Sequence, residues 1–139
     1  MFISMAYAIL DKNTATITLS RAGHDAPLLY KARDQTVSKI NPPGMALGID
    51  SGGVFNRVTG DFSLSLETDD CLVLYTDGVT EALNSEGDEF GMANVIQSIQ
   101  ASATLGAAGI LTRLTDDLRA FVGTYPQHDD ITLIVIRKK

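Results

Sequence analysis

The sequence predicts an α+β fold in which antiparallel β-sheets, one or two of them, carry a pair of helices on one side. β-rich runs, some with alternating polar and apolar residues, lie within residues 2–76, and helical periodicity occupies residues 92–121. A last β-rich run follows at 131–137. At 139 residues the chain is expected to form one domain, residues 1–139, large enough for a hydrophobic core.

Two pairs of strands are expected in the first part of the chain. Residues 2–10 and 14–20 are rich in β-forming residues, and the polar residues 11–13 between them form a hairpin-like connection. Residues 27–31 form a short apolar strand, and residues 37–40 are expected to pair with it.

Three further strands follow a turn at 41–44 that contains two prolines and a glycine. In residues 61–66 apolar side chains alternate with polar ones, which is the pattern of a half-buried strand. The acidic turn 68–70 leads into the apolar strand 71–76, and residues 131–137 form the last strand. These runs complete the predicted antiparallel sheets.

Two amphipathic helices are expected after Gly87. The first has apolar residues at positions i, i+3, i+4 and i+7, which are Met92, Val95, Ile96 and Ile99. The second follows a weak interruption at 106–109, and its inward-facing residues are Ile110, Leu111, Leu114, Leu118 and Phe121. The two apolar faces predict that the helices pack together on a sheet.

Composition and charge exclude several classes of function. A net charge of −6 provides no basic surface for nucleic acid. No stretch is expected to span a bilayer and no charged-then-apolar leader begins the sequence, so a cytoplasmic protein is expected. Cys71 is the only cysteine, which excludes an intrachain disulfide and a multi-cysteine zinc site, and its apolar surroundings predict a buried side chain.

Acidic residues follow one apolar strand and precede another. Asp77 comes directly after the strand 71–76, and Gly78 lets the backbone turn there. Asp129 and Asp130 come just before the last strand. If the two strands are antiparallel neighbours, these carboxylates lie at one edge of the sheet, where oxygen ligands favour Mg²⁺ or Mn²⁺. The alternative is that they are solvated turn and strand-end residues.

Five segments, in order along the chain, resemble the metal-dependent protein phosphatase (PPM) superfamily in its bacterial SpoIIE-like branch. They are MFISMAYAILD (1–11), RAGHDAPLL (21–29), LGI (47–49), LYTDGVTEALNSEGDEFG (74–91) and DDITLIVIR (129–137). The resemblance extends over nearly the whole chain. It implies a β-sandwich core and hydrolysis of phosphoserine or phosphothreonine in proteins, in pathways that regulate sigma factors and stress responses.

The resemblance also implies a mechanism and its residues. Two Mn²⁺ or Mg²⁺ ions would lie between the sheets, and a water that bridges them would attack phosphorus. Asp77 and Asp129 match metal-ligand positions of the family, whereas Asp130 and Gly78 are candidates for contacts beside the ions or with substrate. Phosphorylated anti-anti-sigma-type proteins are the substrates that the family implies.

Four other residues are weaker candidates for the site, each with a structural alternative. Arg21 stands where the family has asparagine and is either a phosphate-facing cation or a surface residue. His24 either hydrogen-bonds near the site or stabilises a turn. Glu81 is either a site residue or a charge in the first turn of a short helix, and His128 either carries protons or is an ordinary loop residue.

One motif of the family, an Asp-x-x-Gly-His-Gly-like segment that supplies the carboxylate bridging both metals, is not found in this sequence. The chain is therefore expected to resemble the C-terminal part of a phosphatase domain, with weak metal binding and little or no activity by itself. The alternative function is a catalytically dead regulatory domain that binds an anti-anti-sigma-type partner. Open strand edges and uncovered apolar surface also predict self-association, such as a dimer.

Overall fold

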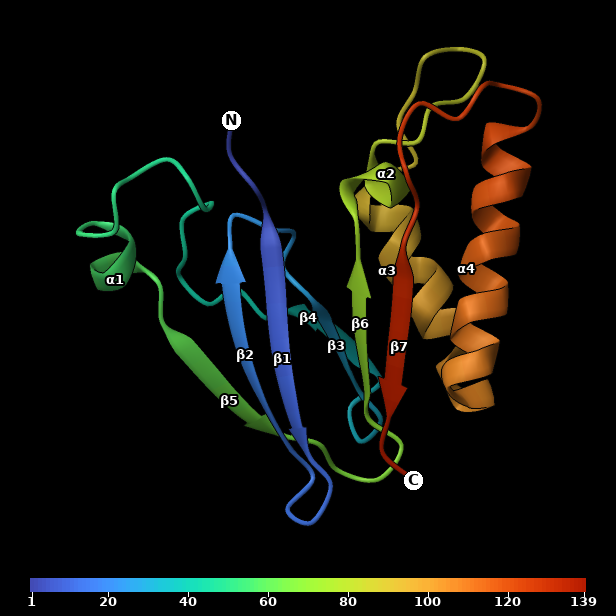
Figure 1. The fold of residues 1–139 in the computed structure, drawn as a ribbon. Coiled ribbons are helices and arrows are strands. Elements are labelled where there is room, and N and C mark those ends of the chain that lie inside the picture. The colour runs from blue at the N-terminus through green and yellow to red at the C-terminus, as the bar shows by residue number, and fades with distance from the viewer.

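The computed structural model describes residues 1–139 and shows two antiparallel sheets stacked face to face, with helices on one side (Figure 1). The strands are β1 (Met5–Asp11), β2 (Thr16–Ala22), β3 (Leu28–Lys31), β4 (Thr36–Lys39), β5 (Asp61–Ser65), β6 (Cys71–Tyr75) and β7 (Leu133–Arg137). The helices are α1 (Phe55–Val58), α2 (Asp77–Thr80), α3 (Gly91–Ser102) and α4 (Gly106–Val122), with the 3₁₀ helix η1 (Ala103–Leu105). The strand orders are β1-β2-β5 and β4-β3-β6-β7. The predicted α+β class is confirmed.

The two sheets bury a small apolar layer between them. It consists of alternate residues of strands that face each other, which are Ile17, Leu19, Leu29, Leu66 and Leu72. The period of two along β2 and β6 places these side chains on the inner faces and the intervening residues on the outer faces. This layer is the core of the predicted β-sandwich.

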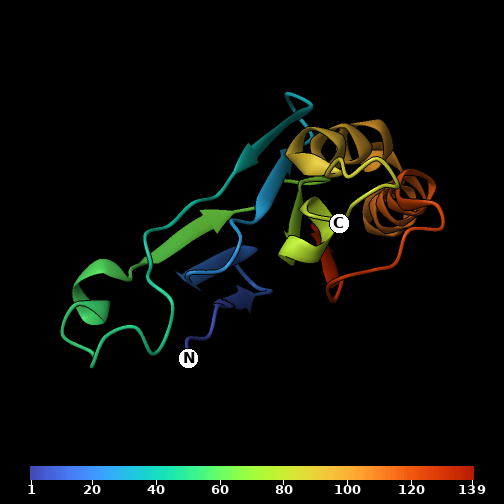
Figure 2. The ribbon, with the colours of Figure 1, turned by 90° about the horizontal axis from the view of Figure 1, so that it is seen from above.

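A larger apolar core lies between the second sheet and the helices. Figure 2 shows α3 and α4 together on the side of this sheet that faces away from β1, β2 and β5. Cys71, Val73 and Tyr75 of β6 pack there against the helices, among them Ile99 of α3 and Leu114 of α4. Cys71 is fully buried, as the sequence predicts, and burial raises the pKa of its thiol. The predicted helix pair on one side of the sheet is confirmed.

The helical region 91–122 is an exception to the expectation that no stretch of this chain is long and apolar enough to span a bilayer. By length and composition alone this segment is apolar enough to cross a membrane. The structure breaks it at η1 and at Gly106, where φ is 77°, so that α3 and α4 pack side by side on the sheet. The apolar residues of this segment include those with which the two helices contact each other and the sheet.

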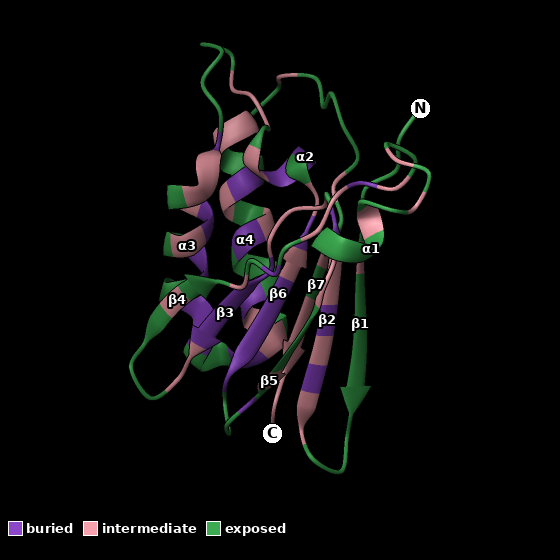
Figure 3. Cartoon of the chain, turned by 90° about the vertical axis from the view of Figure 1, so that its left-hand side faces the viewer, coloured by how far each residue is buried: buried purple, intermediate pink, exposed green.

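Strand β1 leaves one edge of the first sheet unpaired. It pairs with β2 on one side only, and Figure 3 shows it exposed along almost its whole length. Tyr7 and Ile9 on one face are 57% and 54% exposed, and Leu10 on the other is 45% exposed. No charged side chain interrupts β1 before Asp11. An exposed, apolar and uncharged edge strand can pair with another strand.

The short helix α1 was not expected from the sequence. Its four residues have no buried side chain. The carboxylate of Asp50 nevertheless accepts hydrogen bonds from the backbone N–H groups of Gly52, Val54 and Phe55, at 2.7 to 3.3 Å. These bonds lower the pKa of Asp50, since they favour its charged form. They satisfy N–H groups that a helix start otherwise leaves free.

A fully buried carboxylate, that of Asp70, connects the ends of several strands. Its oxygens accept hydrogen bonds from Lys31 Nζ at 2.7 Å and from the backbone N–H groups of Ala32 and Glu67 at 2.9 Å each. The backbone of Asp70 also accepts a hydrogen bond from Lys138, just past β7. One side chain thus joins the end of β3 to the turn that precedes β6.

Candidate metal centre

The register between β6 and β7 brings the predicted acidic residues to one edge of the second sheet. The strands are antiparallel neighbours, with Tyr75 opposite Leu133. Asp77 lies two residues beyond the paired end of β6, and Asp129 and Asp130 lie shortly before the start of β7. The pairing on which the metal prediction depends is therefore present.

Thr76 fastens the two acidic segments to each other. Its Oγ1 donates a hydrogen bond to the backbone oxygen of Asp130 and accepts one from the backbone N–H of Thr132, both at 2.9 Å. The backbone N–H of Thr76 also donates to the backbone oxygen of Thr132 at 3.2 Å. Sequence reasoning did not single out Thr76, although it directly precedes the Asp-Gly pair. Its side chain holds the backbone beside Asp77 against the backbone of Asp130.

Gly78 permits the same close approach from the other side of Asp77. A Cβ atom at this position would lie 2.5 Å from the backbone oxygen of Asp130 and 3.1 Å from its carbonyl carbon. Any larger residue would push the two segments apart, because real Cβ contacts are not that short. The backbone N–H of Gly78 donates to the Asp77 carboxylate at 3.0 Å. Gly78 is buried, and its role is to let the backbones touch.

The three carboxylates at this edge are exposed, and none forms an ion pair. Asp129 Oδ1 accepts a hydrogen bond from the backbone N–H of Asp130 at 2.7 Å, so each of the two predicted ligands keeps oxygen lone pairs free. Oxygen donors of this kind suit a hard divalent cation. No group of three or more acidic, histidine or cysteine side chains gathers anywhere in the chain. With so few carboxylates at this edge, water would have to complete the coordination of any cation bound there.

Arg21, near the end of β2, and His24, just after it, make structural contacts with neighbouring segments. The Arg21 guanidinium donates to the backbone oxygen of His24 at 2.6 Å, to Asn41 Oδ1 at 2.7 Å and to the backbone oxygen of Pro42 at 3.3 Å. His24 Nδ1 lies 3.5 Å from Ser4 Oγ. Two of the three Arg21 nitrogens therefore bond to the 41–44 turn and the third bonds to the backbone of His24, which favours the structural alternative for Arg21.

The segment from Arg21 to Asp25 also approaches the end of β6. Burial raises the pKa of Tyr75 to about 12, and the negative charge of Asp25 contributes to the rise while the positive charge of Arg21 opposes it. Asp25 was not predicted as a site residue, although it directly follows the Gly-His pair. It precedes β3, which pairs antiparallel with β6, so Asp25 lies toward the same sheet edge as Asp77.

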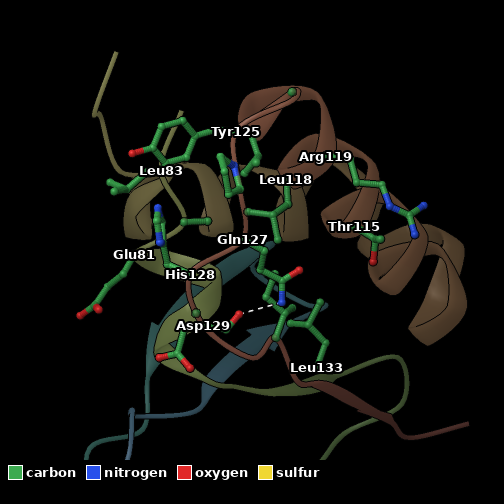
Figure 4. Close-up of a pocket in the computed structure, with 16 residues that line it drawn as sticks. Glu81, Leu83, Thr115, Leu118, Arg119, Tyr125, Gln127, His128, Asp129 and Leu133 are labelled. Carbon is green, nitrogen blue, oxygen red and sulfur yellow. Dashed lines mark hydrogen bonds between the residues drawn. The ribbon is translucent and has the colours of Figure 1, made fainter. Parts of the chain in front are cut away.

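A cavity of about 580 Å³ adjoins the acidic edge (Figure 4). Its walls come from α2 and the segment after it, from α4, and from residues 123–133. Gly78 and Asp129 line it, and so do Glu81 and His128. Glu81 follows the last residue of α2 instead of occupying the first turn, because the helix is only four residues long. Neither Glu81 nor His128 forms a side-chain hydrogen bond, and both are exposed.

Comparison with known proteins identifies sequence relatives of the chain. The sequence profile of the family described as Stage II sporulation protein E (SpoIIE) matches residues 1–139. The phosphoserine phosphatase RsbU of Bacillus subtilis is 30% identical over 141 aligned residues, which cover 100% of this chain and 40% of RsbU. The chain thus spans well under half the length of this relative.

Solved structures share the fold. The SiaA-PP2C domain of Pseudomonas aeruginosa superposes with a TM-score of 0.81 at 18% identity, over 99% of this chain and 52% of that one. The phosphatase domain of SpoIIE from Bacillus subtilis, presoaked with Mn, gives a TM-score of 0.70 at 16% identity, over 96% of this chain and 56% of that one. These likenesses establish the PP2C-type sandwich as the architecture of the chain.

Proposed function

Since the chain belongs to the SpoIIE family, we propose that residues 1–139 form the C-terminal part of the domain of a metal-dependent protein phosphatase that hydrolyses phosphoserine or phosphothreonine. The observation that supports this most directly is the close contact between the segments that contain Asp77 and Asp130, at the edge of the second sheet. Thr76 and Gly78 hold the backbone around Asp77 in contact with Asp130, beside Asp129. The similarity to a phosphoserine phosphatase over the whole chain supports the same chemistry.

In this proposal Asp77 and Asp129 hold a Mn²⁺ or Mg²⁺ ion. When bound, such an ion neutralises phosphoryl oxygens and lowers the pKa of coordinated water. The chain's own contribution is rigidity: Thr76 fixes the two segments, and the absent side chain of Gly78 lets them touch. Asp130 takes part through its backbone, since its carbonyl oxygen accepts the Thr76 hydroxyl.

The substrate class follows from the family. RsbU is named a phosphoserine phosphatase, and the substrate proposed for this chain is a phosphorylated protein of the anti-anti-sigma type in a stress-response pathway. A cytoplasmic location is part of the same proposal. Acidic character, with a net charge of −6, excludes a phosphate-rich polymer such as nucleic acid as the natural substrate surface.

A binding function without catalysis is the second candidate. It is favoured by the small number of carboxylates, because two acidic side chains bind Mg²⁺ or Mn²⁺ less tightly than a larger acidic cluster would. In this alternative the domain binds an anti-anti-sigma-type partner and hydrolyses nothing. Metal dependence of turnover separates the two functions.

The first prediction concerns metal removal. The full-length gene product is expected to hydrolyse p-nitrophenyl phosphate and a phosphoserine peptide in Mn²⁺, to lose this activity in EDTA, and to regain it when Mn²⁺ is restored. Residues 1–139 alone are expected to bind Mn²⁺ weakly in calorimetry and to show little turnover. Micromolar affinity with robust turnover by residues 1–139 alone would contradict this second expectation. Absence of metal-dependent turnover in the full-length protein would favour the binding function.

The second prediction concerns self-association through the open edge of β1. The chain is expected to form dimers or larger species at high concentration, because β1 presents apolar side chains and unpaired backbone groups. Ile9→Lys places a charge on this edge and is expected to shift the sedimentation equilibrium of the chain toward monomer.

Ile49→Lys is the matched control for this edge. Ile49 is 61% exposed but lies in the loop before α1 and belongs to no strand. The same substitution there is expected to leave self-association unchanged. A wild-type chain that remains monomeric at millimolar concentration, or equal effects of the two lysines, would count against pairing through β1.

A further inference from the structure

The cavity beside the acidic edge has an apolar floor. Seven of its 16 lining residues are hydrophobic. Leu118 and Val122 of α4 line it together with Ile131 and Leu133, and Leu83 comes from the segment after α2. Figure 4 shows the side chains of Leu118 and Leu133 on opposite sides of this space. A floor of this composition favours an apolar ligand group.

The wall that includes residues 123–129 is held in place before any ligand binds. The backbone N–H of Gly123 donates to the backbone oxygen of Arg119 at 2.9 Å, and that of Tyr125 donates to Val122 at 3.1 Å. Gln127 Nε2 donates to the backbone oxygen of Asp129 at 2.7 Å, and the rings of Tyr125 and His128 meet edge to face at 5.3 Å. A pre-formed wall lowers the entropy cost of binding.

The cavity is continuous with the candidate metal centre. Asp129, one of the two proposed metal ligands, lines the cavity, and so does Gly78, which directly follows the other. The cavity therefore borders one proposed ligand and the residue next to the other. Polar groups surround the apolar floor on the Asp129 side and on the α4 side, where Arg119 and Thr115 are found (Figure 4).

We propose that this cavity is a specificity site for substrate, which takes an apolar side chain of the phosphoprotein segment that flanks the phosphorylated residue. The proposal rests on the phosphatase function proposed above. A volume of about 580 Å³ accommodates a leucine-sized side chain together with part of its backbone. The polar side chains around the floor are available to the peptide groups on either side of that residue. The cavity thereby recognises a residue beside the phosphorylated residue of the substrate, while the metal centre recognises the phosphate.

The experiment compares peptides that differ at one position. The probes are fluorescein-labelled phosphoserine dodecapeptides made of Gly and Ser, each with a single leucine at one flanking position. The full-length protein in Mn²⁺ is expected to hydrolyse the peptide with leucine at the preferred position with a kcat/KM at least about tenfold higher than the leucine-free peptide, as expected for an apolar pocket. Fluorescence anisotropy measures binding of the same peptides separately from turnover.

A pair of threonines on α4 provides a filling variant and its control. Thr115 lines the cavity, whereas Thr112 is exposed on the same helix and does not. Thr115→Trp is expected to abolish the preference for leucine in both kcat/KM and anisotropy, while hydrolysis of p-nitrophenyl phosphate stays unchanged. Thr112→Trp is expected to change neither.

Each outcome separates this proposal from the proposed function. If the full-length protein hydrolyses p-nitrophenyl phosphate but shows no leucine preference at any position, the cavity is not a substrate site. The same conclusion follows if Thr115→Trp retains the preference. If the full-length protein hydrolyses neither p-nitrophenyl phosphate nor any peptide in Mn²⁺, the proposed phosphatase function is wrong, and the proposed specificity site is wrong with it.

Discussion

Replacement of Asp70 by alanine is expected to destabilise the fold by about 3 kcal/mol or more, within the range found when one partner of a buried charged network is removed. The carboxylate is fully buried and accepts three hydrogen bonds. Its loss leaves the backbone N–H groups of Ala32 and Glu67 without their acceptor, at about 1–3 kcal/mol for each that stays buried. Lys31 is 30% exposed and can turn toward water, so its own contribution is smaller.

The same carboxylate predicts how stability depends on pH. Burial by itself would raise the pKa of Asp70, but the hydrogen bonds from Lys31, Ala32 and Glu67 and the Lys31 charge outweigh it, so the pKa is lowered. An Asp with a lowered pKa in the folded state stabilises the fold above its unfolded pKa of about 3.9. This contribution is lost as the pH falls through the folded pKa. The wild-type chain should therefore lose more stability below pH 4 than Asp70→Ala does.

Urea denaturation at pH 7 and at pH 3, followed by circular dichroism, measures both effects. Asp69→Asn is the control, since Asp69 is 53% exposed and pairs with Arg137 at the surface. Loss of this surface ion pair is expected to lower the free energy of unfolding by less than about 1 kcal/mol. Asparagine also tolerates the positive φ of 71° at this position. Equal costs for the two substitutions would show that Asp70 is not a special anchor of these strands.

The fold could be predicted well where periodicity is strong. The apolar runs that became β6 and β7 and the helical faces around Ile99 and Leu114 follow from spacings of two and of 3.6 residues. The antiparallel pairing of β6 with β7 was only a condition of the metal hypothesis, and the structure supplies it. Strand bounds shifted by one to three residues, as for β1, which begins at Met5 instead of residue 2.

Contacts between distant segments could not be predicted. Nothing in the local sequence shows that Gly78 touches the backbone of Asp130 or that the Thr76 hydroxyl bonds there, because these contacts join residues more than 50 positions apart. Helix α1 depends on one carboxylate, that of Asp50, and has no apolar period. The contacts of Arg21 likewise depend on how the 41–44 turn folds back. The cavity arises only when α4, α2 and the segment before β7 meet.

Asp77→Asn and Asp129→Asn are each expected to lower the activity of the full-length protein in Mn²⁺ by more than about 100-fold, above the 10–100-fold typical of residues that only orient metal ligands. An amide keeps the size of the side chain but removes the negative charge that a hard cation requires. Both carboxylates are exposed and free of ion pairs, so neither substitution should cost stability beyond a few tenths of a kcal/mol.

Two further variants separate ligation from charge. Asp116→Asn removes one negative charge from the exposed face of α4, at a residue that does not line the cavity beside the acidic edge, and is expected to leave activity unchanged. Asp130→Asn is expected to have less effect than either ligand variant, because the backbone oxygen of Asp130, not its carboxylate, meets Thr76. If Asp130→Asn lowers activity as much as Asp129→Asn does, the choice of Asp129 instead of Asp130 as the metal ligand is wrong.

The double variant tests whether Asp77 and Asp129 act on one ion. If they share it, the first substitution already removes the site, and the second should add little to the loss of activity and of Mn²⁺ affinity. Losses that multiply would mean that the two residues act independently, on separate ions or in separate steps. Because the Thr76 hydroxyl holds the two segments together through the backbone of Asp130 and Thr132, without using the carboxylate of Asp77 or Asp129, these contacts should survive in all three variants. Non-additivity would therefore report shared ligation and not a common unfolding, which thermal denaturation of the same proteins checks.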